Sequence, residues 1–166
     1  MFLKIAILTN AFPPQQIGGA ARITAEQAKM LQAAGHEVRV WAIEVPWFKA
    51  PAFKRFFYHL RDLAPTPKLV AEIAAWQPDI LLTHNLTGCG FGTPAQVQKT
   101  GVRWVHILHD IQLFEPSGQL LHLHPVTFWQ ILWAALRSLS FGRSDLIISP
   151  TRWLLWQHRR RSMLRG

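Results

Sequence analysis

The fold is decided by the stretch Leu3-Lys4-Ile5-Ala6-Ile7-Leu8-Thr9 and by the Gly18-Gly19 pair that follows it. The stretch is apolar at nearly every position, which is typical of a β-strand buried on both faces. The glycines open a helical stretch, and Gly35 stands where a C-cap is expected, after apolar side chains that share one helix face: Ile23, Met30, Leu31 and Ala34. A buried strand followed directly by a helix predicts the first half of a βαβ unit.

The same alternation continues along the chain. Further strands are predicted at residues 38–42, 79–84, 102–108 and 146–149, and further helices at residues 69–76, 94–100, 127–139 and 152–161. Because βαβ crossovers are right-handed, this order predicts an α/β fold. We expect one Rossmann-like domain over residues 1–166, with a doubly wound, mainly parallel sheet. Residues 46–67 fit the pattern poorly and are interpreted as an insertion.

Composition excludes several classes of protein. Of the 166 residues, 49% are hydrophobic and 16% are charged, so a disordered or low-complexity chain is excluded. The single cysteine, Cys89, excludes a disulfide framework and a multi-cysteine metal site. The sequence contains no signal peptide and no apolar stretch long enough to span a membrane. We therefore expect a cytoplasmic protein, either soluble or peripheral at the inner face of the membrane.

The net charge of +9 narrows the choice of partners. Residues 49–68 and 137–166 carry the basic surplus, and the middle of the chain is mildly acidic. Such patches attract anionic membranes, acidic protein surfaces and nucleic acids. The run Arg159-Arg160-Arg161 would bind polyanions without specificity, but the sequence holds no nucleic-acid-binding motif, so nucleic acid is disfavoured as a partner.

Polar residues and glycines follow four of the predicted strands. They are Asn10 and Gly18-Gly19 after the first, His84-Asn85-Leu86-Thr87-Gly88 after the third, His109-Asp110 after the fourth, and Ser149-Pro150-Thr151-Arg152 after the last. The carboxyl ends of parallel strands meet at one edge of the sheet, where ligands bind in folds of this kind. A binding site at that edge is predicted; the alternative is that these are ordinary polar loops.

Two of these groups suggest a specific chemistry. At Gly18-Gly19 a phosphate could approach the backbone N–H groups and the positive end of the helix dipole, although glycines can also serve only to turn the chain. His109 ends a strand and should project into the crevice. There its imidazole could donate to a sugar hydroxyl or an oxyanion, or titrate near neutral pH. The alternative is a structural histidine that is bonded to a loop carbonyl.

Other site chemistries are disfavoured. A dinucleotide fingerprint beginning at Gly88 would need a third glycine where Thr93 stands. On a strand, His106 and His109 would point to opposite faces, unless the strand has ended by residue 109. His122 and His124 are predicted in a loop with no third ligand fixed nearby, so no metal is predicted. The sequence has no G-x-S-x-G elbow and no basic neighbour for the cysteine, so nucleophilic hydrolysis is not supported.

The insertion interleaves aromatic and basic residues. On a helix starting at Ala52, one face would hold Phe53, Phe56, Phe57 and Leu60, with Lys54, Arg55 and Arg61 largely off it. This pattern is typical of a helix lying in a membrane interface; the alternative is that the aromatic residues pack on this domain or on another one. We expect His59 and His158 to lie among basic surface residues, and the tryptophans of the last two helices, Trp129, Trp133, Trp153 and Trp156, to belong to the core.

Five segments together resemble glycosyltransferase family 4, in the order that the family shows and over nearly the whole chain. They are residues 4–22, with the strand, Asn10-Ala11-Phe12-Pro13-Pro14 and the glycine pair; residues 31–40; Pro78-Asp79-Ile80-Leu81-Leu82-Thr83-His84-Asn85; His106-Ile107-Leu108-His109-Asp110; and Ser144-Asp145-Leu146-Ile147-Ile148-Ser149-Pro150-Thr151-Arg152. Each segment is ordinary by itself, but their combination is specific.

The resemblance implies one half of a GT-B enzyme, in which two Rossmann-like domains enclose the active site. Such an enzyme transfers a sugar from a nucleotide-sugar to an acceptor with retained configuration, without an essential metal or cofactor. The resemblance implies that this domain mainly binds the acceptor, which would be lipid-linked, a glycan or a small molecule. It also implies that His109 is catalytic and faces the donor sugar. The substrate- and phosphate-binding residues would be Gly18, Gly19, Arg22, Asn85 and Asp110.

The family's second domain has no counterpart in these 166 residues. In the family that domain supplies an Arg/Lys pair that neutralises the leaving diphosphate, and the E-x7-E segment that grips the nucleotide. Without this cationic clamp we expect no sugar transfer by the chain alone, and a partner chain with a C-terminal donor-binding domain could restore it. The alternative is a non-catalytic domain that serves in binding, at a membrane surface or as a scaffold.

Overall fold

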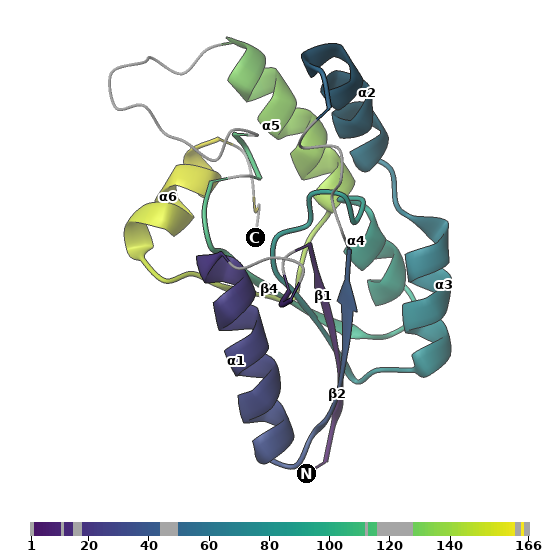
Figure 1. The fold of residues 1–166 in the computed structure, drawn as a ribbon. Helices are drawn as coiled ribbons and strands as arrows, with labels where there is room; N and C mark the ends of the chain where they lie inside the picture. Colours follow the sequence, from purple (N-terminus) through teal and green to yellow (C-terminus); the bar gives the residue numbers. More distant parts are fainter. Residues whose placement is uncertain are drawn as a thin grey trace.

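The computed structural model describes residues 2–10, 12–14, 18–43, 50–111, 113–115, 128–161 and 164. Strands and helices alternate through most of this chain (Figure 1). The strands are β1 (Lys4–Thr9), β2 (Glu37–Ala42), β3 (Ile80–Thr83), β4 (Arg103–Ile107) and β5 (Leu146–Ile148). The helices are α1 (Gly19–Ala33), α2 (Ala52–Asp62), α3 (Pro67–Trp76), α4 (Thr93–Gln98), α5 (Phe128–Phe141) and α6 (Arg152–Arg160).

The strands form one parallel sheet in the order β2-β1-β3-β4-β5. In the centre of the sheet, Ile7 of β1 stands beside Val40 on one side and Leu82 on the other. The prediction of a Rossmann-like α/β fold is therefore confirmed. The chain order reverses between β1 and β3, and the carboxyl ends of these two strands mark the topological switch point where such sheets bind ligands.

Both faces of the sheet are covered, which explains the unbroken apolar run in β1. On the face of α1, Ile5 and Ile7 pack with Ala28 and with Leu82 and Ile107 of the neighbouring strands. The opposite face is covered by α3, α4 and α5 (Figure 1). Its larger cluster includes Ala6, Leu8, Leu81, Trp104, Ile73 and Phe141. Truncating a buried aromatic residue of this size to alanine costs about 3–5 kcal/mol, so Trp104 is a main determinant of stability.

The predicted element bounds hold to within about two residues. α1 ends before Gly35, whose φ of +87° is the left-handed conformation that a helix C-terminus favours. α3 starts at Pro67, two residues earlier than predicted, because proline is well suited to the first turn, where its missing N–H is not needed. α5 extends to Phe141, whose ring packs on Trp104 with centroids 4.7 Å apart, and this contact explains the extra residues at its C-terminal end.

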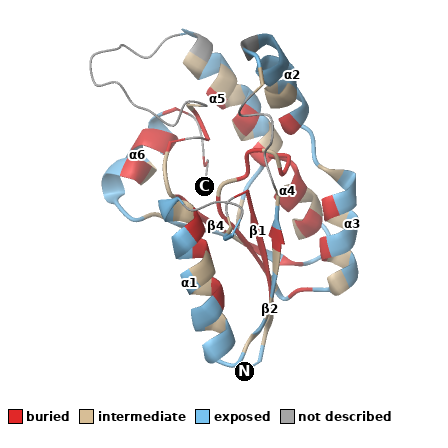
Figure 2. Cartoon of the chain, in the orientation of Figure 1, coloured by how far each residue is buried: buried red, intermediate tan, exposed pale blue. Residues whose placement is uncertain are grey.

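The phenylalanines of α2 face away from the domain. Phe53, Phe56 and Phe57 are 63%, 55% and 64% exposed (Figure 2). The opposite side of the helix faces inward, since the carboxylate of Asp62 is buried and His59 packs edge-on against Trp133 of α5, with ring centroids 6.1 Å apart. The interpretation that these phenylalanines pack on this domain is therefore wrong.

One further expectation about the surface is corrected. Trp153 and Trp156 of α6 are about half exposed and do not belong to the core, because the opposite face of α6 is the one that packs inward, through Leu154 and His158. The predicted tryptophan core on the last helix was therefore wrong. No helix in the described part of the chain is long and apolar enough to cross a membrane.

Candidate functional site

The carboxyl edge of the sheet is held together by backbone hydrogen bonds across the switch point. The N–H of His84 donates to the carbonyl of Leu8, at 3.1 Å, and the N–H of Asn10 donates to the carbonyl of Asn85, at 2.9 Å. These bonds continue the pairing of β1 with β3 beyond the last residues of both strands. They fix the positions from which the side chains of His84 and Asn85 start.

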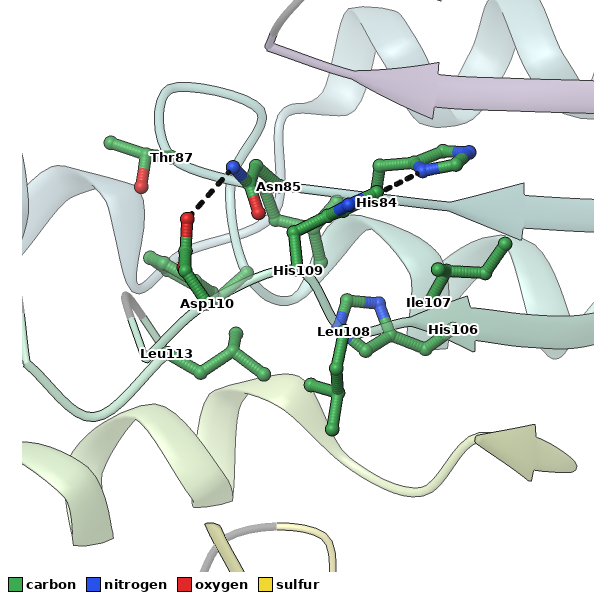
Figure 3. A pocket seen from close by; sticks show the side chains of 11 residues that line it. His84, Asn85, Thr87, His106, Ile107, Leu108, His109, Asp110 and Leu113 are labelled. Carbon is green, nitrogen blue, oxygen red and sulfur yellow. Dashed lines mark hydrogen bonds between the residues drawn. The ribbon is translucent and has the colours of Figure 1, made fainter. Parts of the chain in front are cut away.

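Two imidazoles meet at this edge (Figure 3). Nδ1 of His84 lies 2.7 Å from Nε2 of His109, although 25 residues separate them in the chain. The side chain of His84 is fully buried, and that of His109 is partly buried. Burial, helped by the nearby His109, lowers the pKa of His84 to about 3, and burial also lowers the pKa of His109. Both rings are therefore neutral at pH 7.

Asn85 and Asp110 form a second pair beside the imidazoles. The amide Nδ2 of Asn85 donates to Oδ2 of Asp110, at 3.3 Å (Figure 3). The Asp110 carboxylate attracts protons to the neighbouring His109 and so opposes the effect of burial on its pKa. These four residues line one small pocket with Thr87 and Leu113. Three predicted site residues, Asn85, His109 and Asp110, are thus brought together by the fold.

A buried layer supports this group from β3 and β4. The Thr83 hydroxyl accepts a hydrogen bond from Nε1 of Trp104 and lies 2.8 Å from Nδ1 of His106. The same hydroxyl donates to the carbonyl of Val105, at 3.4 Å. Burial lowers the pKa of His106 well below its usual value. Its ring packs against Phe141, with centroids 4.9 Å apart, so His106 is structural.

The glycine pair lies at the start of α1, which follows the carboxyl end of β1 (Figure 1). Gly18 is the N-cap with a φ of −84°, and no side chain caps the helix. A Cβ atom at Gly18 or Gly19 would have no neighbour within 4 Å in the described structure. Packing within the described residues therefore does not require glycine at either position. At Gly18 the backbone conformation does not require it either. Arg22, one turn on, donates from Nε to Glu26, at 2.9 Å, on the exposed surface of the same helix.

The loop between β3 and α4 is held by the last residue of α2. The Asp62 carboxylate accepts hydrogen bonds from the backbone N–H groups of Gly88 and Gly90, both at 2.8 Å. Burial raises the pKa of Asp62, while the two N–H groups and the nearby Arg137 favour its charged form. The insertion between β2 and α3 therefore braces the loop that carries Asn85 and Thr87.

Sequence reasoning missed two histidines. His84 was predicted to lie at the edge but was not assigned to the site; its position directly before Asn85 was the available signal. His158 was expected on the basic surface, and this was wrong: the residue is fully buried in α6, where Nδ1 donates to the carbonyl of Leu154 and the ring packs on Phe114. The nearby Asp110 carboxylate favours protonation of His158, so α6 also reaches the site. His59, expected on the same surface, is half-buried beside Trp133.

The remaining histidines and the cysteine bear on metal and thiol chemistry. The described residues contain no cluster of three or more histidine, cysteine, aspartate or glutamate side chains that could hold a metal ion. The pair His122 and His124 lies outside the described residues. Cys89 is fully buried, and burial raises its pKa well above the usual value, which keeps it a thiol.

Comparisons with known proteins agree with the fold. The chain is similar to the crystal structure of the glycosyltransferase SnogD from Streptomyces nogalater, with a TM-score of 0.51 and 17% sequence identity. The match covers 91% of this chain and 45% of that one, so the chain spans about half the length of SnogD. The comparison with curated proteins finds no match.

The sequence itself decides the family. The profile of Glycosyltransferase Family 4 matches residues 17–164, a range that begins just before the glycine pair and includes the four residues of the carboxyl-edge pocket. The matched range holds four of the five segments on which the resemblance was based, and the end of the first one, residues 4–22. The chain therefore belongs to glycosyltransferase family 4.

Proposed function

We propose that this chain is the acceptor-side half of a retaining glycosyltransferase. The complete enzyme moves a sugar from a nucleotide-sugar to a lipid-linked, glycan or small-molecule acceptor. One observation carries the proposal: His109 meets His84, Asn85 and Asp110 at the carboxyl edge, on the side of the sheet where α1 begins. A sheet of this topology binds its ligands at this edge.

Each part of the edge has a role in the proposal. His109 is the catalytic residue: it faces the donor sugar and donates a hydrogen bond to a hydroxyl or to developing negative charge. Asn85 and Asp110 bind substrate hydroxyls beside it. The open space at Gly18 and Gly19 admits the donor phosphates to the uncapped N–H groups of α1. Arg22 adds positive charge to the first turns of the same helix.

A second domain is part of this proposal. The leaving diphosphate carries negative charge that needs a cationic clamp, and the described residues of the carboxyl-edge pocket contribute no lysine or arginine to its lining. A C-terminal donor-binding domain, in a partner chain or in a longer polypeptide, provides this clamp. The chain alone is then expected to be inactive.

The test fuses residues 1–166 to the C-terminal domain of a family 4 glycosyltransferase. UDP-glucose, UDP-N-acetylglucosamine and GDP-mannose are supplied with lipid-linked, glycan and small-molecule acceptors, and release of the nucleoside diphosphate is measured. His109→Ala should lower the rate at least about 100-fold, because a positioned hydrogen-bonding or acid–base group contributes a factor of this size. The unfolding midpoint should stay within a few degrees of the wild type.

The matched control is His36→Ala. His36 directly precedes β2 and so lies at the amino edge of the sheet, far from the proposed site. This variant should keep the wild-type rate. A fusion in which His109→Ala and His36→Ala are equally active would contradict the proposed role of His109. A well-folded fusion that transfers no sugar with any donor would favour the non-catalytic alternative.

Attachment to an anionic membrane is a second candidate function, and the orientation of α2 favours it. Residues three and four apart share a helix face, so Phe53, Phe56, Phe57 and Leu60 form one apolar face, called here the α2 apolar face. Soluble domains normally turn such a face inward, whereas here all four residues are exposed. Asp62 lies nine residues after Phe53, on the opposite and buried side.

The charges around this face favour an anionic lipid bilayer as the occupant. Lys54, Arg55 and Arg61 are exposed on α2, and the one acidic residue of the helix is buried. Each basic residue near an anionic leaflet contributes about 1 kcal/mol, and the phenylalanines add binding that salt does not screen. α2 would then lie in the interface with the carboxyl edge facing lipid-linked acceptors.

Co-sedimentation with vesicles tests this function. The chain should bind vesicles that contain phosphatidylglycerol, and the double variant Phe56→Ser/Phe57→Ser should bind much more weakly. Met30→Ser is the control, since Met30 is 71% exposed on α1. Equal binding by all three proteins would contradict the assignment. A different outcome is that only Lys54→Glu stops vesicle binding and that added RNA also abolishes it. This result would indicate a surface that binds polyanions in general.

A further inference from the structure

The contact between His84 and His109 has the geometry of a hydrogen bond in the plane of both rings. The ring planes are inclined by 23°, and the centroids are 5.0 Å apart. That separation is about the sum of the 2.7 Å N···N distance and the two ring radii, so the rings lie edge to edge rather than one above the other. An in-plane nitrogen lone pair is the acceptor that such an arrangement uses.

His84 is the fixed member of the pair. Its backbone N–H donates to Leu8, it directly follows β3, and its side chain is fully buried. His109 follows β4 by two residues and is only partly buried. The orientation of the His84 ring is therefore set by the sheet, and the His109 ring adapts to it.

Counting hydrogens then assigns the donor. Between two neutral imidazoles one nitrogen must donate and the other must accept. Nε2 of His84 is buried and has no hydrogen-bond partner among the described residues. If it carried the hydrogen, an N–H group would be buried without an acceptor, which proteins tolerate less well than an unpaired lone pair. The hydrogen of His84 is therefore on Nδ1, which donates to Nε2 of His109.

We infer that His84 is a positioning residue that holds His109 in the tautomer with its hydrogen on Nδ1. Nε2 of His109 is occupied as an acceptor, so Nδ1 is the nitrogen that can interact with a ligand, and it does so as a donor. This tautomer suits a hydrogen bond to a sugar oxygen or to negative charge, and it cannot accept a proton at that atom. The tautomer assignment stands on this contact and on the unpaired Nε2 of His84, while its catalytic meaning rests on the proposed function.

Nitrogen NMR of the chain tests the assignment without any substrate. With ¹⁵N-labelled histidine, the Nδ1 and Nε2 shifts of each ring distinguish a protonated from a bare nitrogen. At pH 7 both His84 and His109 should show hydrogen on Nδ1 and a bare Nε2. Finding the hydrogen of His109 on Nε2 would overturn the inference, and this measurement needs no variant that could fail to fold.

Two variants of His84 separate positioning from general support of the structure. His84→Asn places an amide N–H near the position of Nδ1 and should keep His109 in the same tautomer. His84→Leu removes the donor and should let His109 shift toward hydrogen on Nε2. The control is His158→Asn, because His158 is also buried but its Nδ1 bonds to Leu154 instead. If His84→Leu left the tautomer of His109 unchanged, the inference would be wrong.

Turnover of the fused enzyme provides the functional reading. His84→Leu should lower kcat about tenfold with little change in KM, and His84→Asn should restore most of the loss. The outcomes remain distinguishable. Correct tautomers together with a fully active His109→Ala variant would refute the proposed function and leave the positioning role intact. If His109→Ala is inactive but the tautomer of His109 does not change when His84 is replaced, the positioning role is refuted and the proposed function remains.

Discussion

Oδ1 of Asp62 lies 2.8 Å from the backbone nitrogen of Gly90, and this bond ties the end of α2 to the loop that follows β3. The second carboxylate oxygen receives the N–H of Gly88 at the same distance. The guanidinium of Arg137, which is fully buried in α5, attracts the same carboxylate. A single buried side chain thus links α2, the loop beside the site and α5.

Replacing Asp62 should loosen this link. In Asp62→Asn one oxygen becomes an NH₂ group that faces a backbone N–H, so one of the two bonds is lost and a buried donor remains unpaired. The expected loss is about 1–3 kcal/mol in the free energy of unfolding, measured with urea. Glu72→Gln is the control: Glu72 forms an exposed pair with Lys68 at 3.9 Å, so a change within about 0.5 kcal/mol is expected. Equal losses in both variants would show that Asp62 does not brace the loop.

Gly90 should tolerate no side chain. Its φ is +80°, and a Cβ atom would lie 2.5 Å from the backbone oxygen of Ala64. Gly101 has a similar φ of +94° but no neighbour within 4 Å of a Cβ, so Gly101→Ala measures the conformational cost alone, about 1–2 kcal/mol. Gly90→Ala adds a clash with main chain and should destabilise the protein by clearly more. Urea unfolding of both variants would decide this, and equal losses would contradict the close approach.

Gly19 should behave in the opposite way. A methyl group there meets open space and replaces a glycine at the start of a helix, so Gly19→Ala should keep or raise the unfolding midpoint. In the fused enzyme the same methyl group would narrow the space for the donor phosphates, and KM for the nucleotide-sugar should rise several-fold. An unchanged KM in Gly19→Ala would contradict the proposal that this glycine makes space for the donor phosphates. A lowered midpoint would show instead that glycine serves the fold.

Stability should fall as the pH drops below about 6.5. Burial, helped by the neighbouring His109, lowers the pKa of His84 to about 3. Burial, helped by the neighbouring Arg137, lowers the pKa of His59 to about 4. Both imidazoles therefore bind protons more weakly in the folded protein. At pH values between these pKa values and 6.5, the unfolded chain holds more protons than the folded protein. The unfolded state therefore becomes more stable relative to the folded state as the pH falls. For His84 this amounts to about 2 kcal/mol at pH 5. The raised pKa of Asp62 opposes the trend, because a folded carboxyl that binds its proton more tightly gains stability in acid.

Urea unfolding at pH 7, 6 and 5 checks the sign. The free energy of unfolding should fall with pH, and the slope should correspond to uptake of more than one proton at pH 5. His59→Gln removes one titrating group and should reduce that slope. A free energy that stays constant from pH 7 to pH 5 would contradict the neutral, buried state of these histidines.

Much of the fold follows from local sequence. A strand buried on both faces must be apolar throughout, and helices that begin and end at glycine or proline are visible along the chain. These signals placed β1, α1 and β4 to within about a residue. The rule that carboxyl ends share an edge was enough to bring Asn85, His109 and Asp110 into one predicted site, because that rule depends only on strand order.

Other features depend on contacts between residues far apart in sequence, and only the tertiary structure decided them. The sequence determined that α2 has an apolar face; which side of the helix packs inward was decided by Asp62, whose carboxylate accepts hydrogen bonds from two backbone N–H groups 26 and 28 residues away. The sequence placed His84 at the sheet edge, but its bond to His109 arises from the register of neighbouring strands and the exact turn of the loop after β4. Periodicity reports which residues share a face, whereas which face is buried, and which polar atoms meet there, is set by the packing of the whole domain.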